Sequence, residues 1–255
     1  MLHRKLLPKK AKLMIDYRTT IYKNCNPNCQ GLEPAFDPLM GERWGRAYDY
    51  YLRGWLPEKK NAAIVDLACG NGKLLYFFKE RGYKNITGVD ISPGQVQLAR
   101  QVIPEVYQMD VIDFLGSYVN SFDLITGLDI IEHLQKDEIL RFLGLCHRAL
   151  RKGGRLILQT PNADSPLSTS IRYGDFTHEV CFNPNVLLGL LHLCKFNQVE
   201  VREQGPVPLG YSIVSTIRYA IWQIIRMGLK LWNFAETGGP GSGLFTRVLI
   251  VSGNS

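Results

Sequence analysis

The sequence predicts an α/β fold whose core is a doubly wound, mostly parallel sheet. From residue 63 to residue 159, short β-branched or apolar runs alternate with helical patterns, and the connections between them are short. A glycine-rich turn follows the first of these runs, and no internal repeat interrupts the alternation. Such alternation is typical of parallel sheets, which bind ligands beyond the carboxyl ends of their strands.

The expected elements follow from this alternation in chain order. Short apolar runs predict strands at residues 63–68, 86–89, 106–108, 122–126 and 155–159, and apolar residues at helical spacing predict helices at 73–81, 94–101 and 136–150. Beyond Pro161 the pattern predicts a polar loop at 162–182, a short helix at 185–194, a strand at 198–202, a long helix at 212–234 and a last strand at 246–251.

The chain of 255 residues is long enough for one domain with appended helices, which we place at residues 61–255. Residues 1–60 are basic, then turn-rich, then aromatic. Tyr48, Tyr51 and Trp55 stand at helical spacing, which indicates an amphipathic helix packed on the main domain or a lid over a bound ligand.

Charge and cysteine usage limit the partners and the compartment. The net charge is +7, but Lys and Arg are scattered and not interleaved with aromatic residues, so we expect no nucleic acid. The six cysteines form no Cys-x-x-Cys pair and no secretory signal is visible, which favours a reduced, cytoplasmic protein. Cys25 and Cys29 are interpreted as part of a polar turn, and we assign no metal ligands.

The stretch from Ala63 to Leu75 is typical of a strand that leads into a nucleotide-binding loop. Asp66 ends the strand, and Gly70 and Gly72 allow the backbone to turn sharply and approach a ligand. A dinucleotide fingerprint would need glycine where Leu75 stands, so a nicotinamide or flavin cofactor is disfavoured.

Two further acids follow the next two strands. Asp90 comes about twenty residues after the glycine loop, where a carboxylate can accept hydrogen bonds from both hydroxyls of a ribose. Asp110 could accept from an adenine amino group while the Val111 backbone donates. Either aspartate alone would more often cap a helix, but three acids at three successive strand ends are hard to explain as caps.

The loop Asp66-Leu-Ala-Cys-Gly-Asn-Gly resembles motif I of the class I S-adenosylmethionine-dependent methyltransferases, with Ala68 at the usual first glycine. The stretch from Phe122 to Leu134 resembles motif IV of the same family. The resemblance implies a Rossmann-like, seven-stranded sheet with an antiparallel last strand, and S-adenosylmethionine as cofactor. The residues that would hold it are Asp66, Ala68, Gly70, Asn71, Gly72, Asp90, Ile91, Asp110, Val111 and Asp129.

The candidates for acceptor chemistry lie after the fourth and fifth strands: Asp129, Glu132, His133, Asp175, His178 and Glu179. His178 is the leading general base because it lies in a long loop without a core-building pattern, although it could instead fasten the loop or bind the acceptor. His133 is a second catalytic candidate, and Asp129 would close the pocket near the methyl group. These groups could bind magnesium only if the fold brings them together.

The segments after residue 159 resemble methyltransferases associated with bacterial cell-surface polysaccharide biosynthesis. This resemblance implies O-methylation of a surface glycan or of its nucleotide- or lipid-linked precursor. The alternatives are an O-methyltransferase of a quinone, phenol or polyketide, and a non-catalytic cofactor-binding scaffold. We place 163–182 as the acceptor loop.

The long helix expected at 212–234 has one polar and one apolar face. Three charged residues, Arg218, Arg226 and Lys230, argue against a membrane span. The apolar face could pack on the domain or on a second subunit of a homodimer, or it could lie on the inner membrane surface.

Overall fold

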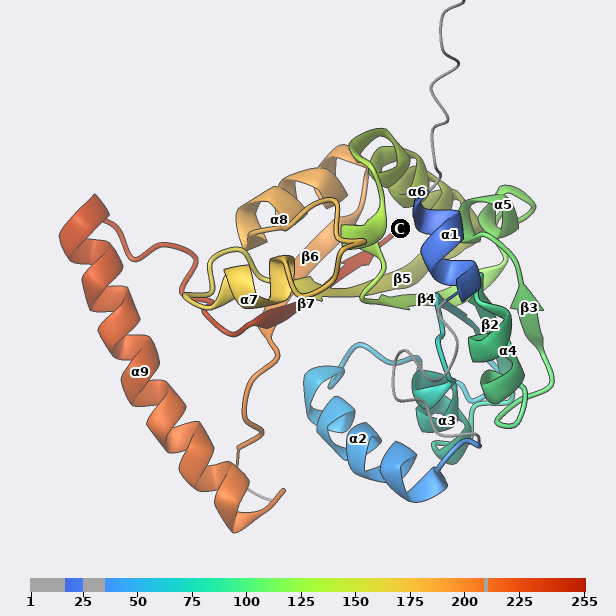
Figure 1. Cartoon of the computed structure of the whole chain (residues 1–255), viewed down its shortest axis with the longest axis horizontal. Coiled ribbons are helices and arrows are strands. Elements are labelled where there is room, and N and C mark those ends of the chain that lie inside the picture. The colour runs from blue at the N-terminus through green and yellow to red at the C-terminus, as the bar shows by residue number, and fades with distance from the viewer. Residues whose placement is uncertain (1–16, 25–34, 209–210) are drawn as a thin grey trace, which may run out of the picture.

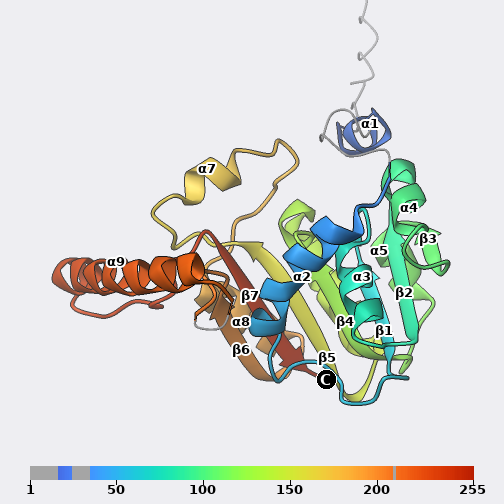
Figure 2. The ribbon, with the colours of Figure 1, turned by 90° about the horizontal axis from the view of Figure 1, so that it is seen from below.

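The computed structural model describes residues 17–24, 35–208 and 211–255. Seven strands form one sheet in the order β3-β2-β1-β4-β5-β7-β6 (Figures 1 and 2). Strands β1 to β5 are parallel to one another, and β7 is antiparallel to both β5 and β6. The predicted doubly wound sheet and its antiparallel last strand are therefore confirmed.

The strands and helices alternate as expected in the first half of the chain. The strands are β1 (Ala63–Leu67), β2 (Asn85–Asp90), β3 (Val106–Gln108), β4 (Phe122–Leu128), β5 (Leu150–Pro161), β6 (Asn197–Glu203) and β7 (Val248–Asn254). The helices are α1 (Tyr17–Asn24), α2 (Pro38–Tyr51), α3 (Lys73–Glu80), α4 (Pro93–Ala99), α5 (Val111–Gly116), α6 (Lys136–Ala149), α7 (Ser168–Arg172), α8 (Pro184–Leu193) and α9 (Ile213–Thr237), with a 3-10 turn, η2, at Ile131–His133.

The structure differs from the predicted elements at three places. Helix α5 was missed because it is short and its apolar residues give less than two turns of periodicity. The predicted loop at 162–182 contains the short helix α7, which buries none of its residues. Strand β5 begins at Leu150, five residues earlier than expected, because a bulge joins its first residues to β4.

The core lies in two layers, one on each face of the sheet. Helices α5 and α6 cover one face together with α8, and α2, α3 and α4 cover the other. Every residue of β1 is buried, as expected of a central parallel strand covered on both faces. Packing on both sides holds the carboxyl end of β1 rigidly.

Helix α2 connects the N-terminal region to this core. Asp37 caps it by accepting hydrogen bonds from two backbone amides, and Pro38 occupies its first turn. Tyr48 packs edge-on against Phe77 of α3, with ring centroids 6.4 Å apart. Trp55 is buried but lies beyond the end of the helix, so the predicted helical spacing of the aromatics holds only as far as Tyr51.

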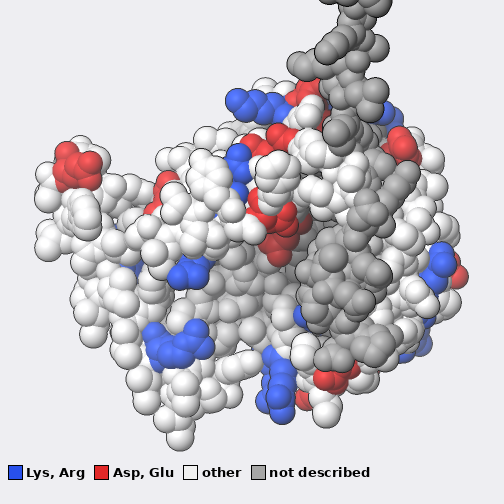
Figure 3. Space-filling model, viewed as in Figure 1, with Lys and Arg blue, Asp and Glu red and all other residues white. Residues whose placement is uncertain are grey.

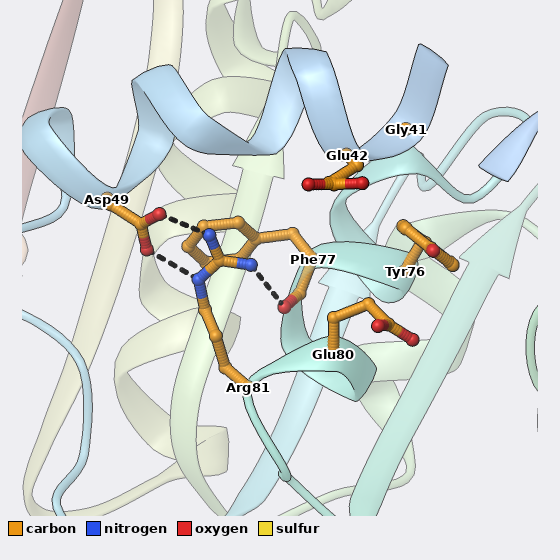
Figure 4. A pocket seen from close by; sticks show the side chains of 7 residues that line it. All are labelled: Gly41, Glu42, Asp49, Tyr76, Phe77, Glu80 and Arg81. Carbon is orange, nitrogen blue, oxygen red and sulfur yellow. Dashed lines mark hydrogen bonds and ion pairs between the residues drawn. The ribbon is translucent and has the colours of Figure 1, made fainter. Parts of the chain in front are cut away.

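A cavity of about 390 Å³ lies between α2 and α3 (Figure 4). Acidic side chains from both helices, Glu42 and Glu80, lie at its edge, and Arg81 pairs with Asp49 across it. None of the predicted site residues line this cavity.

The C-terminal part of the chain adds α9, which projects from the rest of the molecule in both ribbon views (Figures 1 and 2). It runs over 25 residues, of which only Ser215 is buried. Among the described residues, no helix combines the length and the apolar character that crossing a membrane requires.

Candidate active site

The cofactor half of the site begins at the carboxyl end of β1, beside β4, where the direction of strand winding reverses. Asp66 is 2% exposed, and the Thr126 hydroxyl donates to its Oδ1 over 2.7 Å. Burial raises the pKa of Asp66 to about 7, against the Thr126 hydrogen bond, which lowers it, and with a smaller contribution from the nearby Asp90. A cation bound beside this carboxyl would favour its ionised form.

The glycine loop is tied to the next strand by Asp90. The Gly70 amide donates to Oδ2 of Asp90 over 2.9 Å, and the Ser92 amide donates to Oδ1 over 2.8 Å. Gly72 has φ +89°, and a Cβ there would lie 3.1 Å from the Ala99 Cα. Glycine is therefore required at this turn both for its backbone conformation and for close packing.

The other predicted cofactor residues surround this loop. Ala68 adopts a left-handed backbone with φ 54°, Asn71 is partly exposed, Ile91 is 46% exposed and Val111 is buried. Asp110 accepts hydrogen bonds at Oδ1 from the amides of Ile112 and Asp113, so it is the N-cap of α5. The expectation that capping does not explain the strand-end acids is thus wrong for Asp110, because the missed helix begins there.

The acceptor half begins with Asp129, which directly follows β4 and has φ 54°. The Gln159 side-chain amide donates to its Oδ1 over 3.0 Å and to its Oδ2 over 2.9 Å. The Tyr48 hydroxyl donates to Gln159 over 2.6 Å and accepts from Gln204 over 2.8 Å. Desolvation by the surrounding protein raises the pKa of Asp129.

The residues Glu132, His133 and His178 converge, with one possible ligand atom from each lying within 4.8 Å of the others. Glu132 is 1% exposed, and its Oε2 accepts from the Thr160 hydroxyl over 3.0 Å. Its Oε1 is buried without a hydrogen-bond partner, as is Nδ1 of His178. The ring centroids of His133 and His178 are 4.7 Å apart.

Burial shifts the pKa values of Glu132 and His133 away from their charged forms. It raises the pKa of Glu132 well above its usual value and lowers that of His133, which the neighbouring His178 lowers further. A buried carboxyl and two imidazoles, with unpartnered atoms on Glu132 and His178, are a donor set that suits a divalent cation.

Backbone hydrogen bonds join the turn that follows β4 to the 163–182 loop, although the two segments are far apart in the sequence. The amides of Glu179 and Val180 donate to the carbonyl of Glu132 over 2.8 and 3.2 Å. The base of the 163–182 loop is closed by an amide of Ala163 that donates to the Phe182 carbonyl. The loop is therefore held so that His178 lies against the turn that follows β4.

Figure 3 shows acidic side chains gathered near the middle of one face, between α7 and α1. Helix α1 lies close to this region, because Arg18 pairs with Glu138 of α6 over 2.7 Å and with Glu179 of the loop over 3.5 Å. The polar turn predicted at Cys25 and Cys29 lies outside the described residues.

Three residues that contact the site were missed from the sequence: Thr126, Gln159 and Tyr48. Gln159 and Thr126 lie in apolar strands, which the sequence predicts only as parts of the core. A polar residue inside such a strand could have indicated a role in the site. Tyr48 lies 81 residues before Asp129 in the sequence, so only the packing of α2 reveals its role.

Residues 40–200 match the family model of the methyltransferase domain. The chain belongs to this family. Together with the glycine loop and the strand-end acids of β1 and β2, the family establishes a methyltransferase that uses S-adenosylmethionine as its cofactor.

Curated relatives of this methyltransferase include the ubiquinone biosynthesis O-methyltransferase of Pseudomonas aeruginosa, 27% identical over 144 residues, which are 50% of this chain and 61% of that protein. The small RNA 2'-O-methyltransferase of Mus musculus is 28% identical over 159 residues, 56% of this chain and 39% of that protein. The chain thus spans about three fifths and two fifths of the length of these relatives.

Solved structures share the fold. An S-adenosylmethionine-dependent methyltransferase from Archaeoglobus fulgidus has a TM-score of 0.62 at 20% identity, covering 86% of this chain and 95% of its own. Another from Mesorhizobium loti has a TM-score of 0.57 at 20% identity, covering 84% of this chain and all of its own. The similarity in fold extends over most of this chain.

Proposed function

We propose that this methyltransferase transfers the methyl group to a hydroxyl oxygen of a small phenol- or quinone-type acceptor, and that Glu132, His133 and His178 hold a divalent cation beside it. Oxygen is the acceptor atom named for both kinds of curated relative reported above. One of them acts in ubiquinone biosynthesis, which favours the small-molecule alternative over the glycan.

The observation that supports this proposal most is the pair of buried, unpartnered atoms in the acceptor half. Oε1 of Glu132 and Nδ1 of His178 each lack a hydrogen bond, although unsatisfied buried polar atoms are costly. Both belong to the group whose ligand atoms converge within 4.8 Å. A bound divalent cation would lower the pKa of a coordinated hydroxyl and so supply a better nucleophile near neutral pH.

The chain's own residues would position the acceptor and manage its proton. Methyl transfer from a sulfonium requires an in-line approach, so rigid placement of donor and acceptor supplies much of the rate. Thr177 holds His133 through a hydrogen bond of 2.8 Å to its Nδ1, and the loop contacts described above hold His178. His133 has no free nitrogen once it holds the cation, so His178 would accept the hydroxyl proton at the ring nitrogen that does not bind the cation.

Aromatic side chains on the acceptor loop favour a planar acceptor. Tyr173 and Phe176 are 79% and 82% exposed, unusually open for such large side chains, and both lie within five residues of His178. Tyr17 of α1 packs edge-on against Phe176, with ring centroids 5.9 Å apart. Together they offer an apolar wall of the kind that a phenol needs, whereas a sugar needs convergent polar groups.

The glycan acceptor stays a prediction from the sequence, because neither curated relative reported above is named for a glycan. The peripheral membrane contact and the cytoplasmic location also stay predictions. The non-catalytic scaffold is not supported, since the family and the site geometry are those of an enzyme.

The test is an acceptor panel with controlled metal. The chain is treated with EDTA and supplied with S-adenosylmethionine and a catechol, a methyl hexoside or a short RNA, with and without Mg²⁺ or Mn²⁺, and S-adenosylhomocysteine is quantified. We expect turnover of the catechol that rises at least 100-fold when metal is added, and a loss of that stimulation in Glu132→Gln.

The outcomes separate the parts of the proposal. If the catechol is turned over equally well after EDTA treatment and in Glu132→Gln, the proposed cation is refuted, whereas the proposed acceptor class is supported. Turnover of the hexoside alone would refute the phenol and restore the glycan. His192→Ala serves as a control, because His192 lies in the last turn of α8 and is exposed.

A further inference from the structure

Helix α9 is attached to the molecule by its polar side. The Ser215 hydroxyl donates to the Val207 carbonyl over 2.6 Å, and Arg226 pairs with Glu203 of β6 over 3.1 Å. Trp222 donates to the same carboxylate over 3.4 Å. The apolar side of this helix consequently faces away from the domain, which reverses the usual orientation of an amphipathic helix.

The exposed apolar face is large. It includes Ile213, Val214, Ile217, Ile221, Ile224, Ile225, Met227, Leu231 and Trp232, which are between 47% and 81% exposed. Nine large apolar side chains, each about half exposed or more, thus form one solvent-facing surface along the helix. Isolated soluble chains rarely expose so much contiguous apolar surface, whereas one partner in a stable complex buries about 800 Å².

The spacing along this face matches that of a helix-to-helix seam. Apolar or small residues recur at alternating intervals of three and four, at Val214, Ile217, Ile221, Ile224, Gly228, Leu231 and Ala235. This is the repeat of a coiled-coil interface, in which each side chain fits between residues of the facing helix. Gly228 has open space around it, so a partner helix could approach closely there.

The charges beside the seam specify how two copies would pair. Arg218 and Glu236 are eighteen residues apart, about five full turns, so they lie on the same side of the helix. In an antiparallel pair of copies, Arg218 would lie near the partner subunit's Glu236, and the same contact would repeat across the twofold axis. A parallel pair would instead place the two copies of Arg218 on opposite sides of the seam, where neither reaches a Glu236 of the other copy.

The same charges disfavour a membrane surface as the occupant. An interfacial helix places Lys and Arg where they reach anionic headgroups. Here Arg226 faces the domain in its pair with Glu203, and Lys230 lies against Gly243 of the following loop. Arg218 borders the apolar face, but Glu236 borders it on the same side.

We propose that the apolar face of α9 binds the α9 of a second copy of this chain, in an antiparallel, twofold-symmetric homodimer. The interface is independent of the acceptor proposed above, because it uses none of the site residues. Its seam runs from Val214 to Ala235, about 32 Å at 1.5 Å per residue.

The first experiment is sedimentation equilibrium of the full chain at micromolar concentrations, for the wild type, Ile224→Glu and Leu140→Glu. Ile224 is in the seam and 66% exposed, whereas Leu140 is on α6 and 43% exposed, so both variants place a charge at a solvent-facing position. We expect a dimer for the wild type and for Leu140→Glu, and at least a 100-fold weaker association for Ile224→Glu.

A second pair of variants tests the antiparallel arrangement. Arg218→Glu should weaken the dimer about tenfold, and the double variant Arg218→Glu/Glu236→Arg should restore it. A wild-type monomer that co-sediments with phosphatidylglycerol vesicles would overturn the proposal in favour of a membrane surface. A monomer without vesicle binding, or a dimer unchanged by Ile224→Glu, would overturn it as well.

Discussion

The cofactor half and the acceptor half of the site are built in different ways. In the cofactor half, Asp66, Gly70 and Asp90 come from two adjacent strands and the turn between strand and helix, and backbone amides fix their places. In the acceptor half, His178 lies on the 163–182 loop and meets His133 and Glu132, which are 45 and 46 residues earlier in the sequence. The first half is thus fixed by local geometry and the second by tertiary contacts.

The largest expected effects come from one substitution in the cofactor half and one in the acceptor half, and the two substitutions should change different quantities. Asp90→Ala removes the acceptor of the Gly70 and Ser92 amides, so we expect affinity for S-adenosylhomocysteine to fall at least 100-fold. His178→Ala should leave that affinity within threefold and lower kcat at least 100-fold. Calorimetric titration and single-turnover assays measure the two quantities.

The matched control for the histidine is His192→Ala, which should change neither quantity. If His178→Ala weakens both cofactor binding and turnover, the 163–182 loop supports both halves of the site. The proposed division between a cofactor half and an acceptor half would then be wrong.

This division explains what the sequence could predict. The strand-end acids and the glycine turn obey rules that act over about twenty residues, so the sheet and Asp66 could be placed without a structure. The convergence of His178 with Glu132 depends on backbone bonds between segments far apart in the chain, which no local pattern encodes. The capping role of Asp110 was not predicted for a third reason, since α5 has less than two turns and its periodicity is too weak to reveal a cap. The role of Asp110 in cofactor binding stays a prediction.

The second prediction concerns the proton on Asp66. The pKa of this carboxyl is about 7 in the folded chain and near 3.8 when unfolded, so between these values the folded chain holds a proton that the unfolded chain has lost. Stability should therefore fall as pH rises through this window, by about 2 kcal/mol, allowing for relaxation of the site. Urea unfolding at pH 5 and pH 8 measures the change, and Asp66→Asn should lack it.

Cofactor binding gives the same prediction a second readout. The cationic sulfonium should favour the ionised carboxyl, so binding at pH 6 should release a proton from Asp66. Calorimetry in buffers of different ionisation enthalpy detects that release. An equal proton count for the wild type and Asp66→Asn would show that Asp66 is already ionised before binding.

The third prediction tests whether α2 supports the acceptor half. Tyr48→Phe removes the hydroxyl that links Gln204 to Gln159, and so loosens the amide that holds Asp129. We expect kcat to fall about tenfold while the cofactor affinity is unchanged, because a misplaced group near the reacting atoms costs rate more than binding.

The matched control is Tyr51→Phe on the same helix. The Tyr51 hydroxyl donates to the Gly205 carbonyl, so its loss removes a comparable hydrogen bond without touching Gln159. Equal losses of kcat in both variants would mean that α2 acts through stability alone.

The smallest expected effect lies in the cofactor half, at Ala68. Its φ of 54° is left-handed, which costs an alanine about 1–2 kcal/mol that a glycine would not lose. Ala68→Gly also adds freedom to the unfolded chain, which offsets about 0.4–1 kcal/mol of this gain. We therefore expect a net stabilisation of about 0.5 kcal/mol by urea unfolding, against a loss of about 1 kcal/mol for Ala47→Gly within helix α2. Equal losses in the two variants would show that the turn holds no strain, and that a glycine there would contribute only its small size.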